Sequence, residues 1–457
     1  MKHVVIIGNG IAGTTTARHL RKKSDCRITL ISDEHPYFFS RTALMYVYMG
    51  HMRFEDTQPY ENWFWKKNRI DLIQSRVIKV NTAKKEILLQ DITRIRYDDL
   101  VIATGSKPRI LPVPGNHLKG IQGFYFKKDL ETLEMDTISL LKQEKKAKRV
   151  VVIGGGLIGI ELVEMMYSRN IPVTFIVRDA LFFGKTLSEK ESNLLTKHIQ
   201  SHSGIDLRLD TNLLEILSEH NSEKVSAIKV QFQDQKPEVI SCDLVLSAIG
   251  VQPNIDFLNS SKIEVSKGVL VDNYLQTNIQ NVYAIGDCAE LKNPDPFRNS
   301  IEAVWYTARI MGETLANTIA NNFTMKYTPG YWFNSAKFFD IEYQTYGNIS
   351  AKIQGDESRF YWEDNSQMRS LQLNFSKIDK RVLGVNVLGI RMRQEVFEKW
   401  FKQNRKIEYV IEHLQDANFD AEFSKGFEEE VVSYYNKKYN TSLKSRKRSW
   451  KRIFSKF

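Results

Sequence analysis

The sequence predicts an α/β fold in which two Rossmann-like, three-layer ββα domains are followed by an α+β C-terminal domain. Three observations support this prediction: an apolar strand, a glycine loop and a helix at residues 4–13, a second copy at 148–160, and alternating apolar residues after Phe323. The 457 residues also exceed what a single hydrophobic core accommodates. We therefore expect several domains.

The composition is that of an ordinary globular protein, with 42% hydrophobic and 26% charged residues. Seven Lys and Arg residues but no acid lie in residues 444–457, so the rest of the chain carries only +4 of the net charge of +11. A nucleic-acid partner is therefore not expected. The three cysteines, Cys26, Cys242 and Cys288, form no C-x-x-C pair, which favours a reducing compartment. Without a secretory signal or an apolar run of about 18 residues, the expected location is cytoplasmic.

The first glycine loop has the pattern of a dinucleotide-binding motif. Residues 4–13 read VVIIGNGIAG, and a second strand follows at 28–31. Gly8 permits a tight turn, Gly10 lets a pyrophosphate approach the backbone, and Gly13 lets helix and strand pack closely. Together with Ile11 and Ala12, these glycines would present the N-terminus of the helix to the phosphates.

An acidic residue follows the second strand at the place expected of a ribose ligand. Asp33 lies twenty residues after Gly13, and a carboxylate there can accept hydrogen bonds from an adenosine ribose. Glu34 competes for the same role. The alternative is that Asp33 is only a surface acid in a turn.

The motif recurs at residues 148–160, which read KRVVVIGGGLIGI. Here the loop comprises Gly154, Gly156, Leu157, Ile158 and Gly159. Two complete strand–loop–helix motifs in one chain are far more specific than one. The sequence therefore predicts two dinucleotide sites.

The strand after the second loop, 173–177, is followed by Arg178 where an acid would select an unphosphorylated ribose. Arginine suits a 2′-phosphate, so NADPH is slightly favoured over NADH. The alternative is that Arg178 meets only the pyrophosphate or solvent.

Three further segments match a known family in the right order: YDDLVIATGSKP at 97–108, the strand and turn at 244–254, and NVYAIGD at 281–287. With them the sequence resembles the FAD-dependent pyridine nucleotide-disulfide oxidoreductase superfamily. The resemblance covers about residues 1–320 and implies FAD at the first site and NAD(P)H at the second. It implies an FAD-binding domain of residues 1–113 and 246–323, an NAD(P)-binding domain of 114–245, a C-terminal interface domain of 324–443 and a basic tail of 444–457.

The resemblance also implies which other residues contact the cofactors. In the family, the acid of the late FAD motif, here Asp287, holds the ribityl and phosphate region. The remaining contacts implied are Val77, Ala103, Thr104, Gly105, Gly250 and Gly286.

Residues 36–50 resemble the corresponding segment of NADH–rubredoxin reductases, nitrite reductase large subunits and CoA-disulfide-reductase-like enzymes. Arg41 stands where those flavoproteins point a basic residue at FAD, and Thr42 stands where the disulfide-type members carry a redox cysteine. Disulfide exchange needs a low-pKa thiolate beside the flavin. Disulfide chemistry is therefore not expected, and Cys288 is interpreted as a small buried filler.

Two more side chains are candidates for a place beside the reacting rings. Glu161 is the candidate catalytic residue, which would orient the nicotinamide carboxamide or a flavin-side lysine; the alternative is a helix-start carboxylate favoured by the dipole. Residues 301–312 predict a helix whose N-terminus would face the flavin, with Trp305 as an aromatic neighbour. The alternative for Trp305 is burial in a domain seam.

The C-terminal third predicts strands at 370–375 and 382–388 and helices at 393–404 and 423–439. By resemblance this domain forms either a homodimer interface or a docking surface for an electron acceptor. The tail mixes bases with aromatic residues, which suits an anionic membrane surface or an acidic redox partner. A disordered solubilising tail is the alternative.

These observations lead to one expected function and two alternatives. We expect an NAD(P)H-dependent FAD oxidoreductase that passes electrons, without a redox disulfide, to an unidentified acceptor such as a rubredoxin, a ferredoxin or a quinone-like small molecule. A peripheral membrane NADH:quinone reductase docked by its basic tail is the first alternative. A non-catalytic FAD-bound structural or signalling protein is the second.

Overall fold

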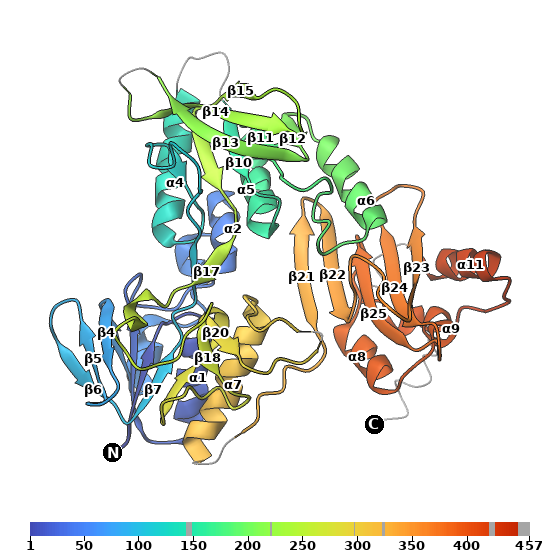
Figure 1. Cartoon of the computed structure of the whole chain (residues 1–457). Helices are drawn as coiled ribbons and strands as arrows, with labels where there is room; N and C mark the ends of the chain where they lie inside the picture. Colours follow the sequence, from blue (N-terminus) through green and yellow to red (C-terminus); the bar gives the residue numbers. More distant parts are fainter. Residues whose placement is uncertain (143–148, 220–221, 297, 322–324, 420–425, 447–457) are drawn as a thin grey trace. The chain divides into compact units, whose positions relative to one another are not determined.

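The computed structural model describes residues 1–457 apart from 143–148, 220–221, 297, 322–324, 420–425 and 447–457 (Figure 1). Contacts divide the chain into two compact units. The first comprises Met1–Ile176 and Asn212–Pro329, and the second comprises Val177–Thr211 and Gly330–Phe457.

The first unit contains a five-stranded parallel sheet. Its strands, in spatial order, are β19 (Val282–Ala284), β7 (Asp99–Ile102), β1 (His3–Ile7), β2 (Arg27–Ser32) and β3 (Ile70–Gln74). The apolar run of β1 is buried from Val4 to Ile7, as is usual for a parallel strand covered on both faces. Helix α1 (Ile11–Lys23) begins beyond the carboxyl end of β1, where the predicted glycine loop lies.

A second parallel sheet in the same unit repeats this arrangement. The strands β9 (Ile121–Gln122), β16 (Leu244–Ser247), β10 (Val150–Ile153) and β11 (Val173–Ile176) lie side by side, and α5 (Leu157–Ser168) follows β10. Each parallel sheet has a three-stranded companion. One is β4 (Val77–Asn81), β5 (Glu86–Leu89) and β6 (Arg94–Arg96), and the other is β13 (Thr211–Ser218), β14 (Val225–Phe232) and β15 (Glu238–Ser241). The predicted pair of Rossmann-like folds is confirmed.

The shorter elements of the first unit connect these sheets. They are η1 (Arg41–Ala43), α2 (Leu44–Tyr48), η2 (Phe54–Thr57), α3 (Asn62–Lys67), β8 (Ser106–Pro108), α4 (Lys127–Lys142), β17 (Val251–Pro253), η3 (Asp256–Leu258), β18 (Val269–Val271), η4 (Gly286–Cys288), β20 (Ala289–Leu291) and α7 (Trp305–Asn321).

Helices α1 and α7 pack closely, and Gly312 makes this possible. A Cβ at Gly312 would lie 2.6 Å from the Ala12 carbonyl oxygen, inside any normal contact. The Thr16 hydroxyl lies 3.0 Å from the Ala12 oxygen and 3.3 Å from the Gly312 oxygen, and it donates across the same contact. The late FAD-domain helix is therefore held against the helix that begins at the first glycine loop.

The helix predicted from residue 301 begins later, at Trp305. The reason lies in Glu302, a buried carboxylate that receives two hydrogen bonds from Arg298, at 2.5 and 2.6 Å. The Thr307 hydroxyl lies 3.2 Å from the same carboxylate. This side-chain pairing holds residues 301–304 in an irregular turn, because a buried charge keeps its partners at the expense of local helix propensity.

The second unit is built on an antiparallel sheet in the order β21 (Phe333–Phe338), β22 (Ile341–Gly347), β25 (Val382–Leu388), β24 (Ser370–Ser376) and β23 (Glu357–Glu363). The remaining elements are α6 (Glu189–Gln200), β12 (Ile205–Arg208), α8 (Gln394–Lys402), α9 (Ile407–Glu412), α10 (Leu414–Ala417) and α11 (Glu428–Tyr439). The strands predicted at 370–375 and 382–388 are confirmed as β24 and β25. The predicted α+β class of the C-terminal part is also confirmed.

Both helices predicted in the C-terminal part exist, with different bounds. The first spans Gln394–Lys402 rather than 393–404. The second begins at Glu428, and residues 423–425 of the prediction lie outside the described residues. This helix ends where Asn440 adopts the left-handed conformation, a usual C-terminal stop.

Residues 177–211 pack with the C-terminal sheet, although the sequence places them within the predicted NAD(P)-binding segment. Glu191 on α6 is fully buried, accepts from the Ser188 hydroxyl at 2.8 Å and from the Asn386 amide at 3.4 Å. The ring of Phe182 meets that of Phe338 edge to face. This packing does not test which residues serve which cofactor, so the predicted domain boundaries stay predictions.

The basic tail lies almost entirely outside the described residues. The described chain ends at Arg446, whose N–H donates to the Glu412 carbonyl at 2.9 Å. The predicted membrane or partner contact of residues 444–457 therefore stays a prediction. Among the helices of the described part, none has both the length and the apolar character that crossing a bilayer requires.

The contact between α1 and α7 yields a stability prediction. In an ordinary helix Gly→Ala stabilises by about 1 kcal/mol, but in Gly312→Ala the new methyl meets the Ala12 carbonyl, and we expect a net loss of about 1–3 kcal/mol. The measurement is the midpoint of thermal unfolding. Arg309→Ala, an exposed change on the same helix, is the control. A midpoint for Gly312→Ala at or above that of the wild type would contradict the packing argument.

Candidate functional site

The first glycine loop is crowded at two of its glycines. Gly8 has φ +108°, and a Cβ there would lie 2.1 Å from the Ala103 carbonyl oxygen. A Cβ at Gly13 would lie 2.0 Å from the Gly8 carbonyl oxygen. Backbone atoms cannot move aside as a flexible side chain can, so both positions require glycine.

Gly10, between them, is open: no atom lies within 4 Å of a Cβ built there. It is the N-cap residue of α1, the N-terminus of the helix has no side-chain cap, and its first turn contains no acid. The positive end of the helix dipole is therefore uncompensated beside open space. These features fit the pyrophosphate of a dinucleotide.

The second loop reproduces this pattern. Gly154 has φ +117°, and its Cβ would lie 2.3 Å from the Ala248 carbonyl oxygen. A Cβ at Gly159 would lie 1.9 Å from the Gly154 carbonyl oxygen, whereas Gly156 is open. Gly156 is the N-cap residue of α5, again without a side-chain cap or an acid in the first turn. Leu157 and Ile158 begin this helix, as Ile11 and Ala12 begin α1.

The predicted turn at 103–105 lies against the first loop. The Ala103 N–H donates to the Ile7 carbonyl at 2.8 Å, which extends the pairing of β7 with β1 up to the loop. The Thr104 hydroxyl donates to the Asn254 carbonyl at 2.7 Å, and the Asn254 N–H donates to the Gly105 carbonyl at 2.9 Å. Two of the segments that carry the family resemblance, residues 97–108 and 244–254, are therefore joined to each other.

Asp287 lies in η4 at the end of β19, on the same sheet edge. Its neighbour Gly286 has φ +72°, and a Cβ there would lie 3.1 Å from the Ala12 side chain. The carboxylate of Asp287 accepts from the Ser106 hydroxyl at 3.0 Å, and burial raises its pKa. Ser106 had not been singled out from the sequence, because a serine one residue after a turn carries no distinctive signal.

Arg41 is held by a partner that the sequence did not suggest. Its guanidinium lies 2.6 Å from Glu34 Oε2, and it donates to the Tyr125 carbonyl and lies 4.5 Å from the centre of the Tyr125 ring. Burial opposes the charge, but the hydrogen bond and charge of Glu34 outweigh it, so the pKa of Arg41 is raised. The Lys127 N–H also donates to Glu34, at 2.8 Å.

This pairing distinguishes the two acids considered for a ribose. Glu34 is occupied by Arg41 and Lys127, whereas the Asp33 side chain is exposed. The arrangement favours Asp33 over Glu34 as the residue with a carboxylate to offer a ligand.

The other candidates of the first site lie on several different elements. Val77 is buried at the start of β4, and Gly250 follows β16 with φ +99° and open space at its Cβ. Thr42 is exposed in η1, 3.3 Å from the Ser40 hydroxyl. Trp305 is half-buried at the first residue of α7, with its ring 5.4 Å from that of Tyr306.

Two of the three cysteines are buried and have raised thiol pKa values. Cys288 is fully buried, its thiol donates to the Ile285 carbonyl at 3.3 Å, and burial raises its pKa. Burial also raises the pKa of Cys242 to about 12. Cys26 is half-buried beside the Ser24 hydroxyl. Raised thiol pKa values are the opposite of what thiol exchange requires.

Glu161, the candidate catalytic residue, carries the most perturbed carboxylate of the second loop. It lies in the second turn of α5, three residues before Glu164. Burial, with a smaller contribution from the Glu164 charge, raises the pKa of Glu161 to about 7. A carboxyl group with that pKa changes protonation state near neutral pH, as a group that exchanges a proton or a hydrogen bond with a ligand often does.

Arg178 is exposed and belongs to the second unit, whereas the second glycine loop belongs to the first. Its predicted contact with a 2′-phosphate is therefore not tested by the structure.

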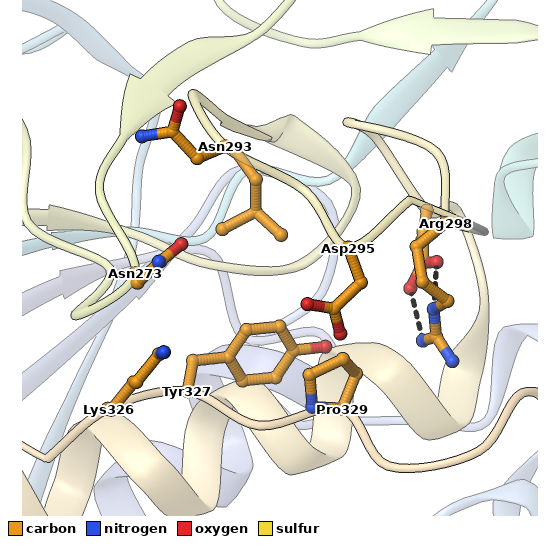
Figure 2. Close-up of a pocket in the computed structure, with 9 residues that line it drawn as sticks. Asn273, Asn293, Asp295, Arg298, Lys326, Tyr327 and Pro329 are labelled. Atoms are coloured by element: carbon orange, nitrogen blue, oxygen red, sulfur yellow. Dashed lines mark hydrogen bonds and ion pairs between the residues drawn. The ribbon is translucent and has the colours of Figure 1, made fainter.

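A small pocket is lined by residues between 273 and 329, none of which belongs to either glycine loop. It has a volume of about 30 Å³ and is lined by charged and polar side chains, among them Arg298, Glu302 and Tyr327 (Figure 2). The buried Tyr327 hydroxyl makes no hydrogen bond within the described part of the chain. This volume holds one or two water molecules. It is too small to hold a dinucleotide.

Comparison with known proteins agrees with this geometry. The family model described as "Pyridine nucleotide-disulphide oxidoreductase" matches residues 2–312. The chain is 32% identical over 294 residues to a nitrite reductase [NAD(P)H] of Bacillus subtilis, covering 63% of this chain and 34% of the relative. It is 26% identical over 407 residues to the assimilatory nitrate reductase electron transfer subunit of the same organism, covering 88% and 49%. The chain thus spans a third to a half of the length of these relatives.

A solved NAD-dependent persulfide reductase from A. fulgidus has the same fold, with a TM-score of 0.79 at 21% identity over 96% of this chain and 84% of that one. The expected family, the enzyme class and the cofactor pair of FAD with NAD(P)H agree with the family match and with the repeated glycine loops. The chain belongs to the pyridine nucleotide-disulphide oxidoreductase family.

Proposed function

We propose that this protein takes electrons from NAD(P)H into a bound FAD and delivers them to a small redox protein, without an intermediate disulfide. The observation that carries this proposal is the repeated loop in which the middle glycine is open and its two neighbours are closed by backbone. One relative, which aligns over 88% of the chain, is named as an electron transfer subunit, and this supports a protein as the acceptor.

The residues divide into those that bind and those that orient. The open backbone at Gly10 and the N-terminus of α1 would hold the FAD pyrophosphate, with Asp33 at the ribose and Asp287 at the ribityl and phosphate region. Gly156 and the N-terminus of α5 would hold the NAD(P)H pyrophosphate. Bound FAD supplies the redox chemistry, accepting a hydride and releasing electrons singly or in pairs.

Two residues would set the surroundings of the reacting rings. Arg41 is charged and held in place by Glu34, so it can present a fixed positive charge to the flavin. Glu161 would hydrogen-bond the nicotinamide carboxamide, as donor or acceptor according to its protonation state. No cysteine lies in residues 41–48, so the acceptor would have to approach the flavin edge itself.

A titration with paired glycine variants tests the cofactor assignment. Under anaerobic conditions NADH or NADPH should bleach the flavin absorbance of the wild type. Gly10→Val should be purified without flavin, because its side chain fills the space for the FAD pyrophosphate. Gly156→Val should retain flavin but require a much higher NAD(P)H concentration for bleaching. Gly50→Ala, at an open turn with φ +79°, tests for a general effect of replacing a glycine.

The outcomes separate the alternatives. A wild type that binds FAD but is not bleached by either nucleotide would favour the non-catalytic alternative. Rapid mixing of the reduced protein with a rubredoxin, a ferredoxin and a soluble quinone then identifies the acceptor class. Faster reoxidation by the quinone than by either protein would contradict the proposed protein acceptor.

The nucleotide preference is tested at Arg178. If its guanidinium binds a 2′-phosphate, Arg178→Ala should weaken the binding of NADPH about tenfold, equivalent to about 1.4 kcal/mol. The binding of NADH should be unchanged. The measurement is the nucleotide concentration at half-maximal bleaching. Lys185→Ala, which removes a nearby charge that pairs with Asp179, is the control. Equal losses for both nucleotides would assign Arg178 to the pyrophosphate instead.

The raised pKa of Glu161 predicts a pH dependence. Because its ordinary value is 4.5 and the folded value is about 7, the carboxyl is neutral below pH 7 and charged above it. The rate of flavin reduction should show an inflection near pH 7 that Glu161→Gln removes. Glu164→Gln should move the inflection to lower pH, since the Glu164 charge raises the pKa of Glu161. An unchanged inflection in Glu161→Gln would rule out this residue as its source.

The same shift has a consequence for stability. The folded state binds more protons than the unfolded state between pH 4.5 and 7, so this group makes the protein less stable as pH rises through that window. Above pH 7 the free-energy cost of keeping Glu161 ionised in the folded state is constant. Glu161→Gln should therefore raise the unfolding midpoint at pH 8 more than at pH 4.5.

A further inference from the structure

The second unit contains a cluster of two histidines and an aspartate that the redox function does not use. The cluster consists of His198 in the last turn of α6, His202 just beyond it, and Asp340 in the turn between β21 and β22. One ligand-type atom from each lies within 4.8 Å of the others. Among the described residues, this is the group of histidine, cysteine and acidic side chains close enough to share a metal ion.

A contact with the backbone fixes the tautomer of His202. Its Nδ1 lies 2.8 Å from the His198 carbonyl oxygen. Since a carbonyl oxygen only accepts, Nδ1 carries the hydrogen and Nε2 carries the lone pair. A histidine bonded in this way to a backbone carbonyl is the usual arrangement behind a metal ligand, because the bond fixes both the tautomer and the ring.

The ring of His202 is also held from one face. It stacks on Phe339 with centroids 4.1 Å apart and planes 24° apart. Phe339 is buried and has φ +57°, which is uncommon outside glycine and places Asp340 beside the helix end. The turn and the helix end thus bring the three side chains together without a metal.

His198 presents a buried ring nitrogen to the carboxylate of Asp340. Its Nε2 lies 2.6 Å from Asp340 Oδ1. The imidazole of His198 and the carboxylate of Asp340 are therefore held side by side, close enough to bind a common ion.

We propose that His198, His202 and Asp340 bind a divalent transition-metal ion of the Zn²⁺ type, with water at the remaining position. Two imidazoles and one carboxylate are a ligand set that zinc accepts, at about 2.0–2.2 Å from each atom. Such a metal would separate Nε2 of His198 and Oδ1 of Asp340 to about 3.4 Å. Asp340 is exposed, and a small rotation of its side chain would give this separation. The ion would tie the end of α6 to the β21–β22 turn.

The structure offers a matched control for this site. His413 repeats the local geometry of His202, with Nδ1 2.7 Å from the carbonyl oxygen four residues earlier and a ring stacked on Tyr409 at 3.8 Å. It belongs to no such cluster within the described chain. His413→Gln therefore removes an equivalent histidine and stack but no proposed ligand.

The test uses the full-length, FAD-containing protein treated with a chelator and then dialysed against Zn²⁺. The wild type should retain one zinc per chain by elemental analysis, and zinc should raise its unfolding midpoint. His202→Gln and Asp340→Asn should each weaken zinc binding by at least about tenfold, and zinc should no longer raise the unfolding midpoint. His413→Gln should behave as the wild type.

The metal-free unfolding midpoints check that each variant folds, and Asp340→Asn changes an exposed group without altering its size. A wild type that retains no zinc overturns the proposal. So does zinc retention by His202→Gln equal to that of the wild type, or a loss in His413→Gln as large as in His202→Gln. Flavin content and bleaching by NAD(P)H are independent of these outcomes, so failure here leaves the proposed redox function unaffected.

Discussion

The close approach of a strand, a turn and a helix at each glycine loop is the constraint on which the rest of the first unit depends. At Gly13 and Gly159 the helix lies so near the preceding turn that a single methyl group would overlap a carbonyl oxygen. That proximity directs the N-terminus of each helix to the carboxyl edge of its sheet. There the positive end of the helix dipole lies beside a backbone with no side chain in front of it, at Gly10 and Gly156.

Segments far apart in the sequence are then gathered around the first loop. Ala103 pairs with the end of β1, Gly286 packs on Ala12, and Gly312 lies against the same helix. Each of these contacts is made by backbone or by a small residue, so the loop is enclosed with little tolerance for change. These contacts bring segments that are far apart in the sequence together beside the first loop.

Charged side chains near the two glycine loops are mostly held by a specific partner. Glu34 fixes Arg41, and Ser106 donates to the buried Asp287. Glu161 differs, since burial and Glu164 leave it poised between its two protonation states. Burial raises the pKa of the Cys242 and Cys288 thiols and so keeps both protonated. These differences favour a site that binds and orients over one that exchanges disulfides.

The sequence by itself determined the fold class, the two glycine loops and the order of the family motifs, because glycine roles and strand–helix alternation are local properties of the chain. It also indicated β24 and β25, whose alternation is regular. It could not determine the start of α7, where the buried Arg298–Glu302 pair overrides helix propensity, nor the packing of α6 with the C-terminal sheet. Tertiary structure likewise decided three other contacts: Arg41 with Glu34, Ser106 with Asp287, and His198 and His202 with Asp340. Each joins residues that no local pattern relates, since only the folded chain brings their side chains within hydrogen-bonding or metal-ligand distance.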